Sequence, residues 1–396
     1  MDRRRHVTLG FERIEALLAA MGNPERAVQG LVQVVGTNGK GTTALALAAT
    51  LEEMGCPSGA YLSPHVLSYT ERVLLRGVLV SEEDFAAAMG ETIELADREE
   101  IPASQFELLT AGALGMFAAA GLRWAILEAG LGARHDATSV VRPDAVVLTN
   151  VSIDHTEYLG ETVDEIAEEK LASLKPGATL FLGTDEGRLV DLAHSACRRV
   201  GAKLVLPGAA SVDASLSGLA PHKADDVRLG ITVAGSLLER SPPAGVEQVV
   251  ARAVGESLPG RFEVREVGGV PVVVDGGHNA AGLSAALAGV RYMYGERSLG
   301  VVFGVLREKD ATSMLAGLNG EANAIVLTRP ESERAADPAQ VEHALLDRGE
   351  RRALVVEDPV EALGVAVKAV REAAGVVLVT GSLSTAAPVL RWLREA

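Results

Sequence analysis

The residues best suited to chemistry lie in one glycine-rich stretch, Gly36-Thr37-Asn38-Gly39-Lys40-Gly41-Thr42-Thr43. An apolar run, Val32–Val35, precedes it, and an Ala/Leu-rich segment, Ala44–Leu51, follows it. This order predicts a buried strand, a loop and the N-terminus of a helix. Glycines let backbone N–H groups close around phosphate oxygens, Lys40 can reach the outer phosphates of a nucleotide, and the Thr42 hydroxyl can bind Mg²⁺. The stretch therefore predicts a nucleotide triphosphate site.

The spacing within this stretch differs from the general P-loop pattern. Gly36 precedes Gly39 by three positions rather than five, and Gly41 separates Lys40 from its threonine. The alternative is a glycine-rich turn that binds nothing. Strand, loop and helix all fall where a phosphate site needs them, and this favours the nucleotide site.

The composition indicates a globular, acidic chain. It has 396 residues, of which 48% are hydrophobic and 23% are charged, enough for roughly two or three domains with their own cores. The net charge of −16 argues against nucleic acid as a partner, because binding to a phosphate backbone needs clustered cations.

Cys56 and Cys197 are the only cysteines, and their spacing does not suit a metal site. This favours a reduced, cytoplasmic setting.

The sequence gives no sign of membrane attachment. The basic N-terminus, residues 1–6, is not followed by an apolar signal core, and no uninterrupted apolar run reaches the length of a membrane span. We therefore expect a cytoplasmic protein without a membrane partner.

A second polar motif follows the next apolar run. Gly59–Leu62 predicts a short strand, and Ser63 and His65 stand directly after it in a Ser-Pro-His turn. Ligands gather at the carboxyl ends of strands in an open parallel sheet, so we expect Ser63 and His65 beside the phosphate loop. As a bare tripeptide, Ser-Pro-His is more often only a turn.

Two further strand ends carry groups that suit a metal. Glu128 closes the hydrophobic run Trp124–Glu128, where a buried charge costs several kcal/mol, as an order of magnitude, unless a cation compensates it. Mg²⁺ would compensate it, and a solvated strand end is the alternative. His155 follows the apolar run Asp144–Val151, and a neutral imidazole there can bind metal.

Helical patterns separate these strands. Helical spacing covers residues 11–22 and much of 81–121, with Ser81 as an N-cap, and Thr162 with Glu165 forms a capping box at the start of a helix that carries Lys170. The many acids on that helix favour an ordinary surface ion pair for Lys170. Ser/Gly/Pro-rich stretches such as 208–218 predict linkers.

The last third of the chain alternates strand and helix patterns, which predicts a second α/β domain with a Rossmann-like sheet. The expected strands lie near Val270–Val274, Leu299–Phe303, Ala324–Leu327, Ala353–Val356 and Val376–Val379.

These motifs together resemble those of the folylpolyglutamate synthase/dihydrofolate synthase family, a branch of the Mur ligase superfamily. They occur in the family's order, so together they are far more specific than any one alone. The resemblance is carried by Gly36–Thr42, Ser63–His65, Tyr69–Val73, Phe106–Thr110, Glu128–Thr138, Asp154–Gly160 and Ile166–Lys170. It implies an α/β fold, with a P-loop-containing N-terminal Mur-ligase-like ATPase domain at 1–258 and a smaller Rossmann-like C-terminal domain at 259–396.

The resemblance also implies a role for each matching residue. Lys170 matches the family's carbamylated lysine, a modification that turns a cation into a carboxylate-like group. The magnesium ligands implied are Thr42, Ser63, Glu128 and His155. The catalytic residues implied are Lys40, Glu128, His155, Lys170, Arg261 and His278. The ATP-binding residues implied are Gly36, Thr37, Asn38, Gly39, Lys40, Gly41, Thr42, Thr43, Arg261 and Asp275.

Two of these assignments come from C-terminal motifs. Pro259-Gly260-Arg261 resembles the family's interdomain turn, whose arginine approaches the triphosphate, and guanidinium suits phosphate because it can bind it bidentately. A plain surface arginine is the alternative. Asp275-Gly276-Gly277-His278-Asn279 resembles the family's Asp-Gly-Ala-His-Asn motif, with Asp275 toward the ribose.

The chain also departs from the family. The family places a Gln and an Asn near residues 222–226, with the Asn contacting adenine, whereas this chain has Lys223 and Asp226. This leaves the mode of adenine recognition open. Further departures occur at Ala133 and Ser139, and Ala280 replaces a usual proline.

The activity implied by the resemblance is ATP-dependent amide ligation with Mg²⁺. L-Glutamate is joined to a pterin carboxylate, that of dihydropteroate, a reduced folate or both, through an acyl phosphate. One alternative is a Mur-type ligase that acts on a different acid, for which the departures leave room. Another is a P-loop NTPase that uses hydrolysis as a switch and ligates nothing. We expect a monomer.

Overall fold

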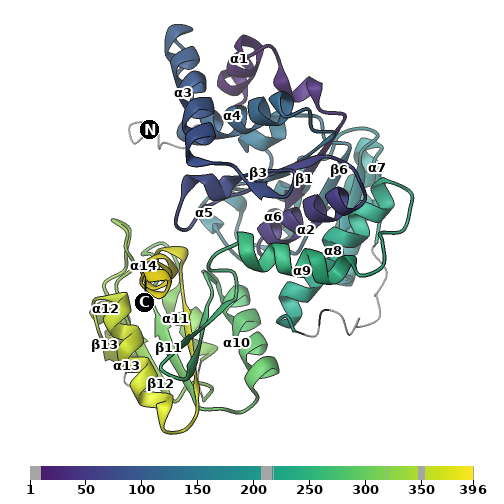
Figure 1. Ribbon diagram of the computed structural model, residues 1–396. Coiled ribbons are helices and arrows are strands. Elements are labelled where there is room, and N and C mark those ends of the chain that lie inside the picture. The colour runs from purple at the N-terminus through teal and green to yellow at the C-terminus, as the bar shows by residue number, and fades with distance from the viewer. Residues whose placement is uncertain (1–9, 207–215, 217, 319, 347–352, 396) are drawn as a thin grey trace. The chain divides into compact units, whose positions relative to one another are not determined.

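The computed structural model of the protein describes residues 10–206, 216, 218–318, 320–346 and 353–395 (Figure 1). Most of the stretch 208–218, for which the composition predicts a linker, lies outside these residues. The described chain divides into two compact units. Unit 1 comprises the described residues up to 216 together with 225–257, and unit 2 comprises those of 217–224 and 258–396.

The described strands of unit 1 form one sheet in the order β4-β3-β2-β5-β1-β6-β7-β8. The pairs from β2 to β8 are parallel, whereas β3 and β4 are antiparallel to their neighbours. The bounds are β1 (Gly30–Val35), β2 (Ser58–Tyr61), β3 (Val73–Leu75), β4 (Val78–Leu79), β5 (Trp124–Glu128), β6 (Ala145–Leu148), β7 (Thr179–Leu182) and β8 (Lys203–Val205). The predicted strand ends thus meet at one edge of a mostly parallel sheet.

Two helices of unit 1 begin at the capping side chains that the sequence predicts. Ser81 accepts a hydrogen bond from Asp84 N–H, and Thr162 with Glu165 forms the expected capping box. The helices are α1 (Glu12–Ala20), α2 (Lys40–Glu53), α3 (Glu82–Arg98), α4 (Gln105–Ala119), α5 (Thr156–Leu159), α6 (Val163–Leu171), α7 (Gly187–Val200) and α9 (Val246–Ser257), with short 3-10 turns at Pro24–Ala27, Tyr69–Arg72 and Ala137–Val140. Helix α8 (Pro221–Leu237) contains the boundary between the units.

The two faces of the unit 1 sheet are covered by different helices. Side chains alternate along a strand, so Leu127 and Glu128 of β5 point to opposite faces. Leu127 belongs to a core shared with α1, α3 and α4, and Val35 of β1 belongs to one shared with α6 and α7. Helix α2 packs on the other face, beside α9 (Figure 1). Glu128 therefore projects toward α2, the helix that follows the phosphate loop.

Unit 2 is a smaller α/β sandwich. Its described strands form a sheet in the order β13-β12-β11-β14-β10-β9, parallel except for the β9–β10 pair. Its elements are β9 (Glu263–Val267), β10 (Val270–Val274), α10 (Ala280–Tyr294), β11 (Leu299–Phe303), α11 (Ala311–Ala316), β12 (Ala324–Leu327), α12 (Pro338–Leu346), β13 (Leu354–Val355), α13 (Pro359–Arg371), β14 (Val376–Thr380) and α14 (Leu383–Glu395). Helices α10 and α13 lie on opposite sides of the sheet (Figure 1). The predicted fold class is confirmed.

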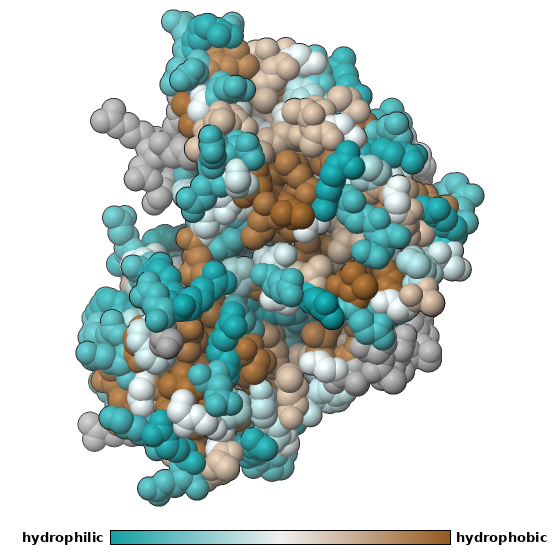
Figure 2. Space-filling model, in the orientation of Figure 1, coloured by the Kyte–Doolittle hydropathy of each residue, from teal (hydrophilic) through white to brown (hydrophobic). Residues whose placement is uncertain are grey.

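The surface carries a mixture of polar and apolar residues. On the face shown in Figure 2, hydrophilic residues cover much of each unit, and hydrophobic residues form smaller areas among them. Among the described residues, no helix combines the length and the apolar character that crossing a bilayer requires.

Candidate active site

The phosphate loop connects β1 to α2 as a backbone cradle. Gly36 and Gly39 have φ values of +149° and +80°, a region that favours glycine. The segment after β6 fixes the loop from one side, because Thr37 N–H donates to the Asn150 carbonyl at 2.9 Å and Asn38 N–H donates to Asn150 Oδ1 at 3.0 Å. The amide of Asn150 donates back to the Asn38 carbonyl at 2.9 Å. The loop is therefore anchored by Asn150, which lies more than 100 positions further along the chain.

The N-terminus of α2 is suited to an anion. Its N-cap is Gly39, which provides no side-chain hydrogen bond to the first turn. The first hydrogen bond back into the loop runs from Thr43 N–H to the Gly39 carbonyl at 2.9 Å, so the N–H groups of Lys40, Gly41 and Thr42 precede the helical ladder. Such donors, together with the helix dipole, favour phosphate oxygens. The predicted phosphate-binding residues 36–43 thus lie together in the loop and the first turn of α2, and their binding to phosphate stays a prediction.

Glu128 and Ser63 meet at the first turn of α2. Glu128 is only 3% exposed, and its Oε2 accepts a 2.8 Å hydrogen bond from Ser63 N–H. A Cβ atom on Gly41 would lie 3.2 Å from the same oxygen, so the carboxylate lies directly against α2. Thr42, the residue after Gly41, and Ser63 are both buried. Hydroxyl and carboxylate oxygens are the ligands that Mg²⁺ prefers, so this donor set fits the ion.

Lys170 is buried, in contrast to the exposed position predicted from the acidic residues of its helix. A surface ion pair was the expectation, and this is wrong, because the side chain is only 4% exposed and Nζ donates to the Gly36 carbonyl at 2.8 Å. The buried residues of α6 include Ile166, Ala167 and Leu171, so Lys170 lies four positions after Ile166 on its apolar face. That spacing was a signal available in the sequence.

The environment of Lys170 favours its neutral form. Burial, and after it the nearby ammonium of Lys40, lower the pKa of Lys170 to about 7, against the opposing effects of Asp154 and Glu169. A lysine with such a pKa has a substantial fraction of free amine at neutral pH. The free amine is the form that can react as a nucleophile.

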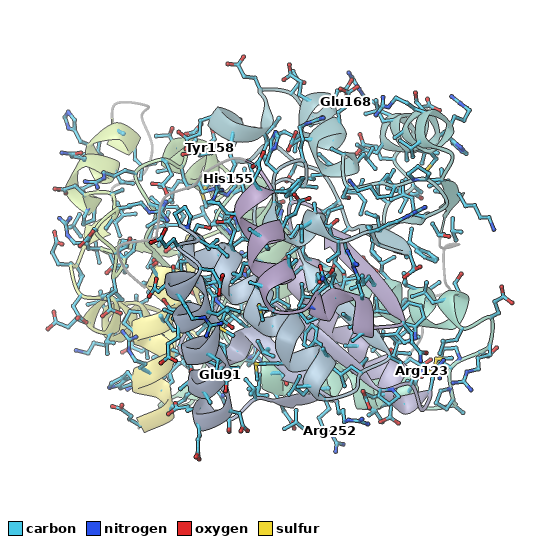
Figure 3. All side chains as sticks on the ribbon, turned by 90° about the horizontal axis from the view of Figure 1, so that it is seen from above. Glu91, Arg123, His155, Tyr158, Glu168 and Arg252 are labelled. Atoms are coloured by element: carbon cyan, nitrogen blue, oxygen red, sulfur yellow. The ribbon has the colours of Figure 1, made fainter. Side chains whose placement is uncertain are left out.

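His155 lies seven residues beyond β6, at the N-cap position of α5. Its φ is +49°, its N–H donates to Asp154 Oδ1 at 2.9 Å, and its ring Nε2 lies 3.9 Å from Asp154 Oδ2. Asp154 is buried. In Figure 3, His155 and Tyr158 lie on one side of unit 1, and Arg123, which precedes β5, lies on the opposite side. His155 is thus at the side of the unit to which the strands point.

His65 contacts two side chains of the segment that follows it. Its Nδ1 accepts a 2.8 Å hydrogen bond from Arg72 Nε, and its ring lies tilted against that of Tyr69, with the centroids 4.1 Å apart. Its expected place beside the phosphate loop stays a prediction. Burial, and then Arg72, lower the pKa of His65 to about 4. The turn is supported by Glu71, which accepts hydrogen bonds from the N–H groups of residues 66, 67 and 68.

Two acids in unit 1 were given no role by the sequence patterns. Asp136 is buried and accepts hydrogen bonds from Gly130, Leu131 and Thr138, and burial raises its pKa. Asp226 of α8 lies against the phosphate loop, because a Cβ atom on Gly39 would collide with its carboxylate. Periodicity contains no signal for either acid, because the Asp136 hydrogen bonds close a local loop, whereas the Asp226 contact depends on how α8 packs against the phosphate loop.

Arg261 and Asp275 are brought together in unit 2. Asp275 Oδ2 accepts a 2.9 Å hydrogen bond from Phe262 N–H, and Oδ1 accepts one of 2.9 Å from Gly277 N–H. The Asp275 carboxylate therefore fixes the turn that carries Arg261, and its expected approach to a ribose stays a prediction. The ring of His278 lies with Nδ1 3.2 Å from the Gly276 carbonyl.

Comparison with known proteins supports the same interpretation. Residues 34–196 match the Mur ligase middle domain, and residues 260–383 match the Mur ligase glutamate ligase domain. A probable bifunctional folylpolyglutamate synthase/dihydropteroate synthase of Haloferax volcanii is 34% identical over 85% of this chain and 43% of its own length, so the chain spans under half of that relative. The dihydrofolate synthase/folylpolyglutamate synthase of Bacillus subtilis is 29% identical over 80% of each chain.

A solved structure agrees in fold over nearly the whole chain. The folylpolyglutamate synthase of Mycobacterium tuberculosis, complexed with ADP and AMPPCP, superposes with a TM-score of 0.87 at 26% identity, covering 97% of this chain and 95% of that one. The chain combines the phosphate loop, the buried Glu128 and matches to both Mur ligase domains. It therefore belongs to the Mur ligase superfamily. Within it, the chain is a member of the folylpolyglutamate synthase/dihydrofolate synthase family.

Proposed function

We propose that this protein is an ATP-dependent ligase that joins L-glutamate to the carboxylate of a pterin acid, which is dihydropteroate, a reduced folate or both. The observation that carries the proposal is the buried Glu128 carboxylate against the uncapped first turn of α2. A buried carboxylate beside an anion site is costly unless a cation lies between them. Mg²⁺ bound to a nucleotide triphosphate supplies that cation.

The proposed reaction has two steps. A carboxylate oxygen of the acid attacks the γ-phosphorus of ATP, ADP leaves, and an acyl phosphate forms. The amine of L-glutamate then attacks the acyl carbon, phosphate leaves with one oxygen of the original carboxylate, and an amide remains. Neither step needs a covalent enzyme nucleophile, so positioning and charge neutralisation account for most of the rate.

The chain's own residues serve these steps by charge and position. Lys40 Nζ and the N–H groups at the start of α2 hold the phosphates, and Arg261 neutralises charge on the transferred phosphoryl group. Mg²⁺ would be held by Thr42, Ser63, Glu128 and His155, and it would supply positive charge that offsets the charge of the phosphates. Asp275 fixes the Arg261 turn, and His278 belongs to the same motif.

Lys170 is the proposed site of carbamylation. Its free amine attacks the carbon of CO₂ and loses a proton, which leaves a carbamate with one negative charge and two oxygens. The lowered pKa supports this, because only the neutral amine reacts. Electron density extending beyond Nζ in a crystal grown with bicarbonate is the expected observation, and density that ends at Nζ would contradict it.

We assign ATP binding to residues 1–258 and glutamate ligation to 259–396, in a cytoplasmic monomer that binds neither nucleic acid nor membrane. The acidic composition supports the absence of a nucleic-acid partner.

Oxygen transfer tests the proposed chemistry directly. The acid is supplied with ¹⁸O in its carboxylate, and the released phosphate is analysed by mass spectrometry after turnover with ATP and L-glutamate. One ¹⁸O atom per phosphate is expected, because the acyl phosphate passes that oxygen on. Unlabelled phosphate accompanied by full turnover would exclude the acyl phosphate route.

A further inference from the structure

A buried lysine holds the backbone of the turn that presents Arg261. Lys223, in the first turn of α8, is only 6% exposed, and its Nζ donates a 2.8 Å hydrogen bond to the carbonyl oxygen of Arg261, 38 residues further along the chain. Both residues belong to unit 2. An ammonium donor makes a stronger hydrogen bond than a neutral one, so this contact is well suited to fixing a backbone position.

The turn itself needs such support. Gly260 and Phe262 have φ values of +65° and +52°, and a non-glycine residue in this region costs about 1 to 2 kcal/mol. A backbone in such a conformation persists when its surroundings determine it. The positive φ of Phe262 therefore indicates that the turn is held in place by contacts from outside it.

Three of those contacts come from the neighbouring strands and their ends. Phe262 N–H donates to Asp275 Oδ2 at 2.9 Å, Gly276 N–H donates to the Gly260 carbonyl at 2.8 Å, and Gly260 N–H donates to Glu263 Oε2 at 3.1 Å. They fix the residues on either side of Arg261. The hydrogen bond from Lys223 acts on Arg261 itself.

The first turn of α8 approaches the same segment through a second residue. The ring of His222 packs edge-on against the ring of Phe262, with centroids 5.4 Å apart. Two consecutive side chains of α8 thus contact two consecutive residues of the turn. Because like charges repel, an ammonium at the Arg261 carbonyl also disfavours a guanidinium folded back toward α8.

We propose that Lys223 is a positioning residue for Arg261: its ammonium fixes the Arg261 carbonyl and so sets the direction in which the guanidinium leaves the turn. The inference rests on the proposed function, in which Arg261 neutralises charge on the transferred phosphoryl group. It gives a structural role to a residue at which this chain departs from the family pattern.

A double-mutant cycle tests the proposal. Lys223→Met, Arg261→Ala and the double variant are compared in phosphate release that depends on L-glutamate, and the exposed Lys368→Met of α13 serves as the control. Lys223→Met is expected to lower kcat about tenfold and leave the KM for L-glutamate unchanged, because a small displacement of a charged group is enough for such a loss. Added to Arg261→Ala, Lys223→Met is expected to cause no further loss.

Either of two results would overturn the proposal. One is a Lys223→Met variant with the kcat of the wild type, and the other is a double variant that loses the full factor of both single variants. If Lys223→Met does not fold, Lys223→Gln, which keeps a polar side chain but loses the charge, is measured with the same expectation.

Hydrogen exchange separates this proposal from the proposed function. In Lys223→Met, the amide of Phe262 is expected to exchange about tenfold faster than in the wild type, whereas Lys368→Met leaves it unchanged. Equal exchange in all three proteins would show that Lys223 does not hold the turn. A wild-type protein without glutamate-dependent phosphate release would contradict the proposed function, and the exchange measurement would still decide whether Lys223 anchors the turn.

Discussion

The ammonium group of Lys170 lies 2.8 Å from the carbonyl oxygen of Gly36, so helix α6 reaches the first glycine of the phosphate loop across 134 positions of sequence. The lysine is buried beside the loop proposed to bind phosphates. This one contact joins the proposed nucleotide-binding loop to the helix that carries the proposed carbamate.

The buried lysine makes stability depend on pH. The pKa of Lys170 is lowered from 10.5 to about 7, so between these values the unfolded state binds more protons than the folded state. The destabilisation is complete below about pH 7 and is relieved as the pH rises. The free energy of unfolding of the wild type, relative to Lys170→Met, is expected to rise by about 1.4 kcal/mol per pH unit between pH 7.5 and 9.

Urea unfolding of both proteins in CO₂-free buffer provides the measurement. Without CO₂ the amine stays unmodified, so the change reports its protonation alone. The exposed Lys203→Met is the matched control and is expected to show no such trend against the wild type. A difference between the wild type and Lys170→Met that stays constant with pH would mean that the lysine keeps its ordinary pKa.

Gly39 is constrained both by its backbone and by Asp226. Gly39→Ala is expected to abolish binding of an ATP analogue, because φ is +80° and the new Cβ would collide with the Asp226 carboxylate. Gly77 has a similar φ of +77° with nothing within 4 Å of a Cβ, so Gly77→Ala isolates the cost of the backbone, about 1 to 2 kcal/mol. Calorimetric titration with AMPPCP measures the binding.

The contribution of Asp226 is then separated from that of the backbone. Gly39→Ala combined with Asp226→Ala is expected to recover part of the binding, because the collision is removed and only the strain remains. If the double variant binds no better than Gly39→Ala, the carboxylate is not what excludes a side chain there.

Glu128 is expected to be essential for magnesium-dependent turnover. Glu128→Gln keeps the size of the side chain and removes the charge, so phosphate release is expected to fall at least about a hundredfold, as an order of magnitude for lost charge stabilisation at a phosphoryl-transfer site. The matched control is Glu157→Gln in the exposed first turn of α5. Full activity of Glu128→Gln across a magnesium titration would contradict the metal-site assignment.

Much of the fold could be predicted because it depends on local patterns. The phosphate loop, the strand ending at Glu128 and the capping box at Thr162 all follow from short-range spacing and backbone preference. Strand β9 was missed because most of its residues are exposed or charged, so its sequence has no apolar run to indicate an edge strand.

The contacts that define the site were less accessible to such reasoning. Lys170 to Gly36 and Lys223 to Arg261 join residues far apart in sequence, and only tertiary packing brings them together. The acidic residues around Lys170 predict an exposed side chain, whereas its spacing from the apolar residues of α6 predicts a buried one. Lys170 is buried because the apolar face of α6 packs into the core.

Phosphate release from Mg·ATP, with and without L-glutamate, tests the central claim most directly. The purified protein is assayed with dihydropteroate and with tetrahydrofolate separately. Release that requires L-glutamate and at least one of these acids is expected, and the acid that supports it identifies the folate step. Release that proceeds equally without any amino acid or pterin would contradict the ligase account and favour a nucleotide-hydrolysing switch.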